Sequence, residues 1–355
     1  MPKRERDAEN ADQYEDAYDA YERALDPLYS DRRVRGQHGL RPRHFPRPKE
    51  EEAAAQLAVL TPLDLGFETT YRPGRHEAPW LLSSLRVFYD NELITDILAL
   101  VRGGKEASVY RCAAHPALGV PFLAAKVYRP HEFRTMRNDA VYRRGRQVLA
   151  GDGHAVKKTD HRIMRAVAQK TAFGVKVMHV SWLMHEYTAM ARLHRAGGAV
   201  PQPVSYSENA ILMSYHGDGQ MAAPMLNEVE LKPNEARRLF REVLRNVRLM
   251  LEQGMIHGDL SAYNILYWEG QITLIDFPQV VNSGAGYSGA LGTAHNDDAY
   301  GLLQRDIERV CDYFVRQGVS CDPGALTDEL WQTYVAMEGG NRLADESRLF
   351  AEMDA

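Results

Sequence analysis

Apolar residues recur at intervals of three and four positions in several parts of the chain. Such positions fall on one face of a helix, so the pattern predicts helices. The ranges with this pattern are 80–98, 178–196, 234–253, 299–317 and 325–350. Gly254 follows the third range directly, at the position where a glycine commonly ends a helix.

Short apolar runs predict strands in the segments between these helices. These runs are Val101–Tyr110, Phe122–Tyr128, Ala210–Tyr215, and two runs within 265–275. In the first of them, glycines lead into the strand-like part. Glu269 and Gly270 separate the last two runs, which indicates a tight hairpin. Most of the strands precede Gly217 and most of the helical residues follow it. We therefore expect an α+β protein with a strand-rich part before a helical part.

Length and composition limit the class of protein. A chain of 355 residues can bury a large core, and its net charge of −5 gives no overall basic signature for nucleic acid. No apolar run reaches the ~18 residues of a membrane span, and the N-terminus lacks the apolar core of a signal peptide. The three cysteines form no CxxC pair, which favours a reducing compartment without structural zinc. We expect a cytoplasmic protein.

Two segments are too polar to predict a packed core. Residues 1–60 alternate acidic and basic stretches, so a disordered charged tail is expected, or a docking arm for an acidic or nucleic-acid partner. Residues 131–172 are basic and long for a simple connection, which predicts a flexible basic loop with some helix.

Three polar residues around the hairpin form the strongest candidate site. Asp259 and Asn264 lie five positions apart before the first strand, and Asp276 follows the second strand. This layout is typical of phosphoryl transfer, in which one carboxylate orients the acceptor and an amide and a second carboxylate hold metal ions. The alternative is ordinary turn chemistry, but three such residues flanking one hairpin favour the catalytic interpretation.

Two charged residues stand in apolar surroundings earlier in the chain. Lys126 interrupts the strand Phe122–Tyr128, and Glu186 lies on the apolar side of the helix 178–196. Each charge needs a partner if it is buried, and a lysine–glutamate pair positions phosphates in protein kinases. The turn Gly103-Gly104-Lys105 precedes a strand, where backbone N–H groups can approach phosphate oxygens.

Taken together, these motifs resemble the RIO family of atypical serine/threonine protein kinases. The matching stretches are Gly104–Tyr110, His257–Asn264, Leu274–Gln279, Ile211–Asp218 with Ala223–Leu226, and Leu303–Ile307 with Asp312–Phe314. All of them occur in the family's order within residues 80–317. The resemblance implies a two-lobed protein-kinase-like fold with a small strand-rich N-lobe, 99–216, and a larger helical C-lobe, 217–355. Residues 61–98 would form an N-terminal helical extension without a winged-helix pattern.

The resemblance also implies a role for each matching residue. Asp259 would orient the acceptor, Asn264 and Asp276 would bind Mg²⁺ or Mn²⁺, and Lys126 would hold ATP phosphates and pair with Glu186. The residues expected over the phosphates are Gly104, Lys105 and Ser108, and those expected to bind adenine through their backbone are Met213 and Tyr215. ATP is therefore the expected substrate, with a protein serine or water as acceptor. A ribosomal precursor or RNA is the further partner expected for the basic segments.

Some residues depart from ordinary kinase patterns. Arg102-Gly103 replaces the family's Ser-Thr, Ser214 replaces an acidic hinge residue, and Gly258 replaces the arginine of the usual His-Arg-Asp. No Ala-Pro-Glu follows Asp276, so a peptide platform in the activation segment is not expected. Three hypotheses remain open: a RIO-type kinase or ATPase switch, an aminoglycoside- or choline-type phosphotransferase, and a non-catalytic scaffold that binds ribosomal precursors.

Overall fold

The computed structural model describes residues 69–74, 77–104, 106–129, 148–150, 155–157, 160–169, 171–283 and 298–336. The predicted tail 1–60, Lys105 and much of the predicted loop 131–172 lie outside these ranges. The chain forms two compact units, one of residues 1–118 and 126–135 and one of residues 119–125 and 136–355. The predicted lobe boundaries at 99–216 and 217–355 stay a prediction.

The first unit combines a helix with a strand pair. Helix α5 (Ala78–Asp90) buries its apolar face, and β1 (Ile94–Gly103) pairs antiparallel with β2 (Ala107–Ala114). A short 3₁₀ turn, η1 (Pro116–Leu118), follows. The N–H of Tyr71 donates to the carbonyl of Ile97 over 2.7 Å, which fastens the segment 69–74 to β1.

The helix predicted over 80–98 was wrong in its second half. The helix ends at Asp90, and Glu92 takes a left-handed φ of 54° that turns the chain into β1. Ile94 and Ile97 are buried in that strand. Their spacing of three fits a helix equally well, but β-branched residues that pair with β2 favour the strand.

A five-stranded sheet has the order β1-β2-β3-β5-β4. Its further strands are β3 (Phe122–Tyr128) and β5 (Ala210–Ser214), close to the predicted ranges, and β4 (Pro203–Tyr206), which was not predicted. In β3 the residues Phe122–Ala125 belong to the second unit and Lys126–Tyr128 to the first.

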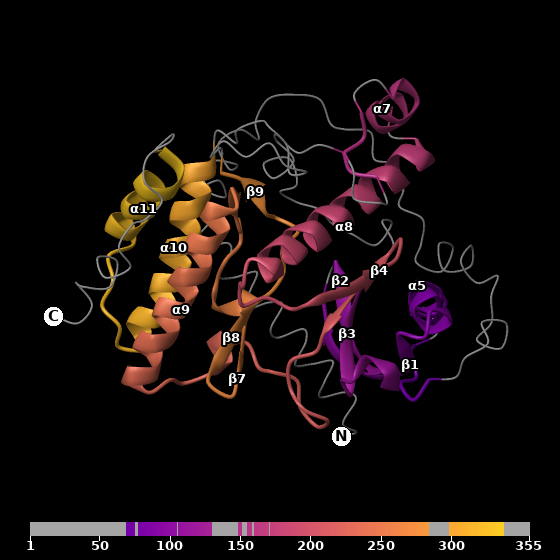
Figure 1. Cartoon of the computed structure of the whole chain (residues 1–355), viewed down its shortest axis with the longest axis horizontal. Helices are drawn as coiled ribbons and strands as arrows, with labels where there is room; N and C mark the ends of the chain where they lie inside the picture. Colours follow the sequence, from indigo (N-terminus) through magenta and orange to yellow (C-terminus); the bar gives the residue numbers. More distant parts are fainter. Residues whose placement is uncertain are drawn as a thin grey trace, which may run out of the picture. The chain divides into compact units, whose positions relative to one another are not determined.

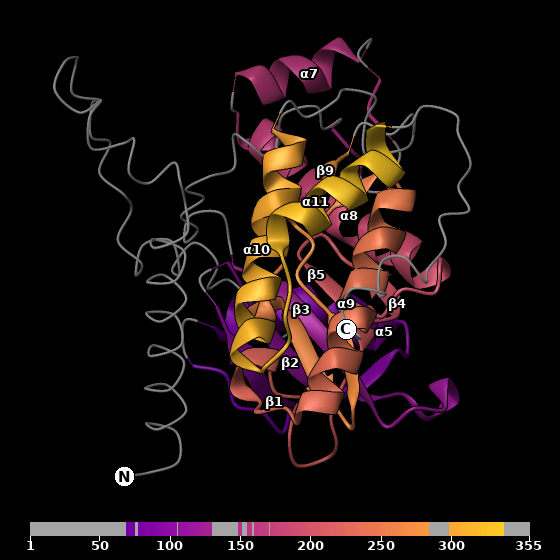
Figure 2. The same cartoon turned by 90° about the vertical axis from the view of Figure 1, so that its left-hand side faces the viewer.

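Helices dominate the second unit (Figure 1). They are α7 (His161–Ala168), α8 (Ala172–Arg195), α9 (Pro233–Glu252), α10 (Ala299–Arg316) and α11 (Pro323–Trp331), which a π-helical turn extends (Gln332–Ala336). Both views show α10 beside α11, and Phe240 of α9 packs on Phe314 of α10 with ring centroids 5.1 Å apart (Figure 2). Gly254 ends α9 with a φ of 70°, as predicted.

Short strands and turns of the second unit carry the candidate site. The predicted hairpin is formed by β7 (Ile265–Trp268) and β8 (Gln271–Leu274), and it turns at Glu269 and Gly270. Both of these residues have a positive φ. Strand β6 (Met255–Ile256) pairs with β9 (Val281–Asn282), and 3₁₀ turns occur at η3 (Leu226–Glu228) and η4 (Ala262–Asn264). In the described part of the chain, no helix is both long and apolar enough to cross a membrane.

Candidate functional site

A loop after β6 carries the central residues of the site. His257 is buried, and its Nε2 lies 3.1 Å from the carbonyl oxygen of Ile275, directly after β8. Its Nδ1 accepts the N–H of Asp259 over 3.3 Å. The ring also packs on Phe277 with centroids 5.1 Å apart. His257 thus links the start of the loop to the chain around Asp276.

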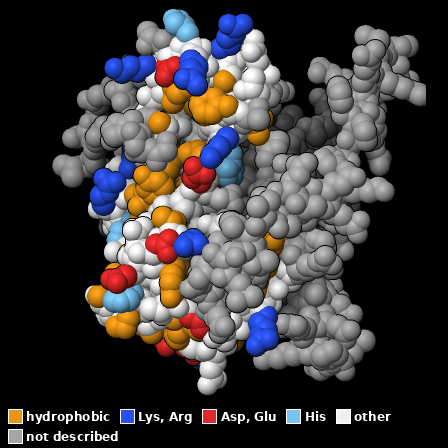
Figure 3. Space-filling model, turned by 90° about the vertical axis from the view of Figure 1, so that its right-hand side faces the viewer, with side chains coloured by type: hydrophobic (Ala, Val, Ile, Leu, Met, Phe, Trp, Pro, Cys, Tyr) orange, Lys and Arg blue, Asp and Glu red, His pale blue; other side chains and the backbone are white. Residues whose placement is uncertain are grey.

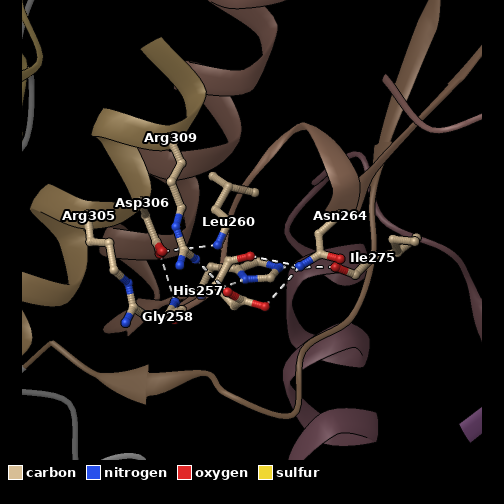
Figure 4. Close-up of polar contacts among 9 residues, drawn as sticks. His257, Gly258, Leu260, Asn264, Ile275, Arg305, Asp306 and Arg309 are labelled. Carbon is tan, nitrogen blue, oxygen red and sulfur yellow. Dashed lines mark hydrogen bonds and ion pairs between the residues drawn. The ribbon is translucent and has the colours of Figure 1, made fainter. Parts of the chain in front are cut away.

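Helix α10 holds the main chain on both sides of Asp259 (Figure 4). The carboxylate of Asp306 accepts the N–H of Gly258 over 2.7 Å and the N–H of Leu260 over 3.0 Å. Arg305, one residue earlier, donates to the carbonyl oxygen of Gly258. Gly258 has a φ of 81°, a left-handed conformation that glycine adopts without a steric penalty. This conformation gives a local reason for glycine where kinases usually carry arginine.

Burial controls the ionisation of Asp306. Loss of solvent raises the pKa of this fully buried carboxyl group. His257, Arg305, the N–H of Gly258 and Arg309 each lower that pKa, but burial is the largest effect.

The side chain of Asp259 is held at both carboxylate oxygens. Arg309 Nη1 donates to Asp259 Oδ1 over 2.5 Å, and Asn264 Nδ2 donates to Asp259 Oδ2 over 3.2 Å. The same Asn264 nitrogen lies 2.8 Å from the main-chain oxygen of Asp259. The carbonyl of Asn264 in turn accepts the N–H of Ile275 over 2.9 Å. The structure therefore brings the predicted residues Asp259 and Asn264 into direct contact.

Asp276 lies immediately after these contacts in an uncommon backbone conformation. Its φ is 71°, in the left-handed region that residues with a Cβ rarely occupy. Such strain costs ~1–3 kcal/mol and is found preferentially at functional sites. Phe277 and Pro278, which follow, are both buried and fix the chain beyond it. Asp276 is itself partly exposed.

The oxygen ligands of Asn264 and Asp276 fit a hard divalent cation. The nitrogen of Asn264 is used in holding Asp259, so the amide Oδ1 is the atom left for a cation. Among the described residues no three His, Cys, Asp or Glu side chains gather as a complete metal cage. Mg²⁺ is commonly held by one or two protein oxygens together with substrate phosphates, so this sparse set suits it.

The predicted hinge forms the end of β5 and the turn after it. Met213 is in β5, and the ring of Tyr215 meets Phe122 edge-on with centroids 5.9 Å apart. The imidazole of His216 lies between two hydroxyls, with Nε2 3.3 Å from Ser214 Oγ and Nδ1 3.4 Å from Thr273 Oγ1. Burial lowers the pKa of His216.

The remaining predicted residues are divided between the units. Glu186 is 3% exposed in α8, which confirms its position on the apolar side of that helix. In the first unit, Gly104 follows β1, Ser108 is buried in β2, and Lys126 in β3 places its ammonium 5.5 Å from the ring centroid of Tyr128. Lys126 and Glu186 belong to different units, so their ion pair stays a prediction.

No role was predicted for Arg305, Asp306 or Arg309 from the sequence. A signal was present, because Asp306 and Arg309 occupy the buried side of α10 next to Ile307 and Val310. Charged residues at buried helix positions need partners, and the same reasoning drew attention to Glu186.

The sequence of this chain is similar to those of known proteins. The RIO domain family model matches residues 141–326. The RIO-type serine/threonine-protein kinase Rio1 of Haloferax volcanii is 29% identical over 246 residues, which cover 68% of this chain and 70% of the relative. The serine/threonine-protein kinase RIO1 of Chaetomium thermophilum is 30% identical over 241 residues, 65% of this chain and only 41% of the relative.

A solved structure supports the fold. The Rio2 kinase of Chaetomium thermophilum, in a complex with ADP, Mg²⁺ and phosphoaspartate, superposes with a TM-score of 0.50 at 20% identity. The match covers 84% of this chain and 79% of that one, and it confirms the predicted α+β, kinase-like fold class. Since the family model spans more than half of the sequence, the chain belongs to the RIO family.

Proposed function

We propose that this protein is a RIO-type atypical serine/threonine kinase or ATPase. It transfers the γ-phosphate of ATP to serine, including its own serines, or hydrolyses ATP as a conformational switch. The observation that carries the proposal is the arrangement around Asp259, in which Arg309 and Asn264 each hold one carboxylate oxygen. The names of the relatives agree with it, since they are RIO-type serine/threonine-protein kinases.

Each predicted residue has a place in this reaction. Asp259 orients the attacking hydroxyl or water, and Asn264 Oδ1 and the carboxylate of Asp276 hold Mg²⁺, or Mn²⁺ in its place. When bound, the metal neutralises charge that develops on the phosphates. Lys126 holds the α- and β-phosphates with Glu186 as its partner. The turn of Gly104, Lys105 and Ser108 covers the phosphates, and the backbone of Met213 and Tyr215 binds adenine.

The strained backbone of Asp276 favours the switch as a second candidate function. In that reaction a carboxylate oxygen of Asp276 forms a bond to the γ-phosphorus while the bond to the ADP oxygen breaks. Water then hydrolyses the acyl phosphate and restores the carboxylate. The solved Rio2 complex contains a phosphoaspartate, which supports considering this reaction here.

Turnover of Mg-ATP by the wild type, Asp259→Ala and Asp276→Ala tests the function. We expect both substitutions to reduce turnover by at least ~100-fold, because each removes a group that contacts the reacting phosphate or its metal. Equal turnover in all three proteins would favour the non-catalytic scaffold. Turnover that requires an added aminoglycoside or choline would favour the small-molecule phosphotransferase.

Mass spectrometry after incubation with Mg-ATP separates kinase from switch. Phosphate confined to serine is expected for kinase or autokinase chemistry, and a hydroxylamine-sensitive phosphate on Asp276 is expected for the switch. Both products are read from the same sample, so the comparison is internal.

For the partner, we propose a ribosomal precursor or RNA that binds the basic segments. Lys157, His161, Arg162 and Arg165 on and before α7 are exposed. Basic side chains gather at the α7 end of the face in Figure 3. Phosphate contacts weaken as salt rises. A pull-down of ribosomal precursors at low and moderate salt tests this, and binding that does not change with salt would contradict it.

We also propose a cytoplasmic location. All three cysteines are free thiols, which is typical of a reducing compartment. Fractionation of cells that express the full chain tests this location.

A further inference from the structure

Helix α10 presents a second buried charge to the catalytic loop. Arg309 is 3% exposed and lies three residues after Asp306, on the same side of the helix. Asp306 binds the main chain at Gly258 and Leu260, whereas Arg309 binds the side chain of Asp259 between them. The two residues therefore control different parts of the loop.

The ion pair between Arg309 and Asp259 is unusual in its burial. Their side chains are 3% and 7% exposed, and Nη1 lies 2.5 Å from Oδ1. A guanidinium stays charged in any protein environment, so Arg309 needs an anion at this place. Removal of one member of a buried pair is costly because the remaining charge has no compensation. The pair thus fixes the direction of the Asp259 carboxylate.

A carboxylate held in this way can still accept a further hydrogen bond. Arg309 and Asn264 donate to its two oxygens, and a carboxylate offers about four acceptor positions, so positions remain for an incoming hydroxyl. Orientation of the nucleophile therefore leaves the pair with Arg309 intact.

We propose that Arg309 is a positioning residue that aims the carboxylate of Asp259 at the nucleophile. This inference rests on the proposed function.

Steady-state kinetics of the full-length chain with Mg-ATP test the proposal. In Arg309→Met we expect kcat to fall ~10- to 100-fold, while KM for ATP changes less than about threefold, because misplacement of a reacting group acts mainly on the chemical step.

Arg309→Lys keeps the positive charge and is expected to restore part of kcat. The matched control is Arg316→Met, an exposed arginine in the last turn of the same helix, which leaves kcat and KM unchanged.

A double-mutant cycle separates positioning from a merely structural role. If Arg309 acts through Asp259, Arg309→Met in an Asp259→Asn background causes little additional loss of kcat, and it lowers Tm less than in the wild type. Additive losses in both quantities overturn the proposal, as does an Arg309→Met protein with wild-type kcat.

If Arg309→Met does not fold, the Lys variant carries the test. A folded Arg309→Lys protein with a raised KM for ATP and an unchanged kcat then overturns the proposal, and one with a reduced kcat and an unchanged KM supports it. A wild-type protein without ATP turnover would refute the proposed function itself. Turnover that Arg309→Met leaves unchanged would refute only the role of Arg309.

Discussion

The turn between β1 and β2 leaves no room for a Cβ atom at Gly104. A Cβ at this position would lie 2.8 Å from the carbonyl oxygen of Ala107, whereas a Cβ at Gly103 would meet nothing within 4 Å. Gly104→Ala therefore forces the backbone between β1 and β2 to move, and we expect it to lower the free energy of unfolding by ~1–3 kcal/mol. Gly103→Ala is the matched control and should stay within ~0.5 kcal/mol of the wild type.

Urea denaturation measures both variants, and calorimetric titration with Mg-ATP measures their affinity. If the turn contacts phosphates, Gly104→Ala also weakens nucleotide binding while Gly103→Ala does not. Equal stability of the two variants would contradict the steric argument.

The imidazole of His216 makes the stability of the fold depend on pH. Burial lowers its pKa in the folded chain, so the unfolded chain binds the proton more readily. The contribution to stability is present above the ordinary histidine pKa of ~6.5 and is lost as the pH falls through the lowered value. We expect the wild type to lose more free energy of unfolding between pH 7.5 and 5.5 than His216→Asn does. Denaturant titrations at both pH values measure this difference, and an equal loss in both proteins would contradict it.

At the scale of elements, Asp306 is the main link between α10 and the catalytic loop. Its two carboxylate oxygens accept the N–H groups of Gly258 and Leu260, so Asp306→Asn keeps one acceptor and brings an amide group against the other donor. We expect a loss of ~2–4 kcal/mol in unfolding free energy, since a buried donor is left unpaired. We also expect kcat to fall, because Asp259 lies between the two anchored residues.

Asp312→Asn is the control for this change. Asp312 lies on the same helix but is exposed, so its substitution should alter neither stability nor turnover. Denaturation and ATP turnover of the two variants provide the comparison, and similar values for both would argue against the anchoring role of Asp306.

Elements with a repeated pattern could be predicted from the sequence, and those whose pattern is ambiguous could not. The range 122–128 corresponds closely to β3 because it is a short apolar run, and the range 234–253 corresponds to α9 because its apolar residues follow the helical period throughout. The end of α5 was missed because the spacing of Ile94 and Ile97 fits both a helix and a strand, and pairing with β2 decides the outcome.

The candidate site, too, could be predicted from the sequence only in part. The polar motif around Asp259 and Asn264 could be found because its members are close in sequence. Arg309 lies 50 residues from Asp259, and only the fold brings them together. Pairing of Lys126 with Glu186 depends on two units and stays a prediction.

At the scale of the whole molecule, the anchoring of the catalytic loop bears on how activity is controlled. Kinases that carry arginine before the catalytic aspartate can use it to receive a phosphate from the activation segment, and this chain has Gly258 there. The loop is instead held by Arg305, Asp306 and Arg309 of α10, which are contacts that need no phosphate. We therefore expect full ATP turnover without phosphorylation between Asp276 and Asp306.

Turnover before and after phosphatase treatment tests this expectation, with intact-mass spectrometry to verify that the treated chain carries no phosphate. The expected ratio of the two rates is close to one, because the contacts around Asp259 are the same in both samples. A treated protein that is inactive, and that regains turnover only when a residue between Asp276 and Asp306 is phosphorylated, would contradict it. Arg309→Met provides the internal comparison: its reduced rate should also be independent of phosphatase, since the lost contact belongs to α10 and not to the activation segment.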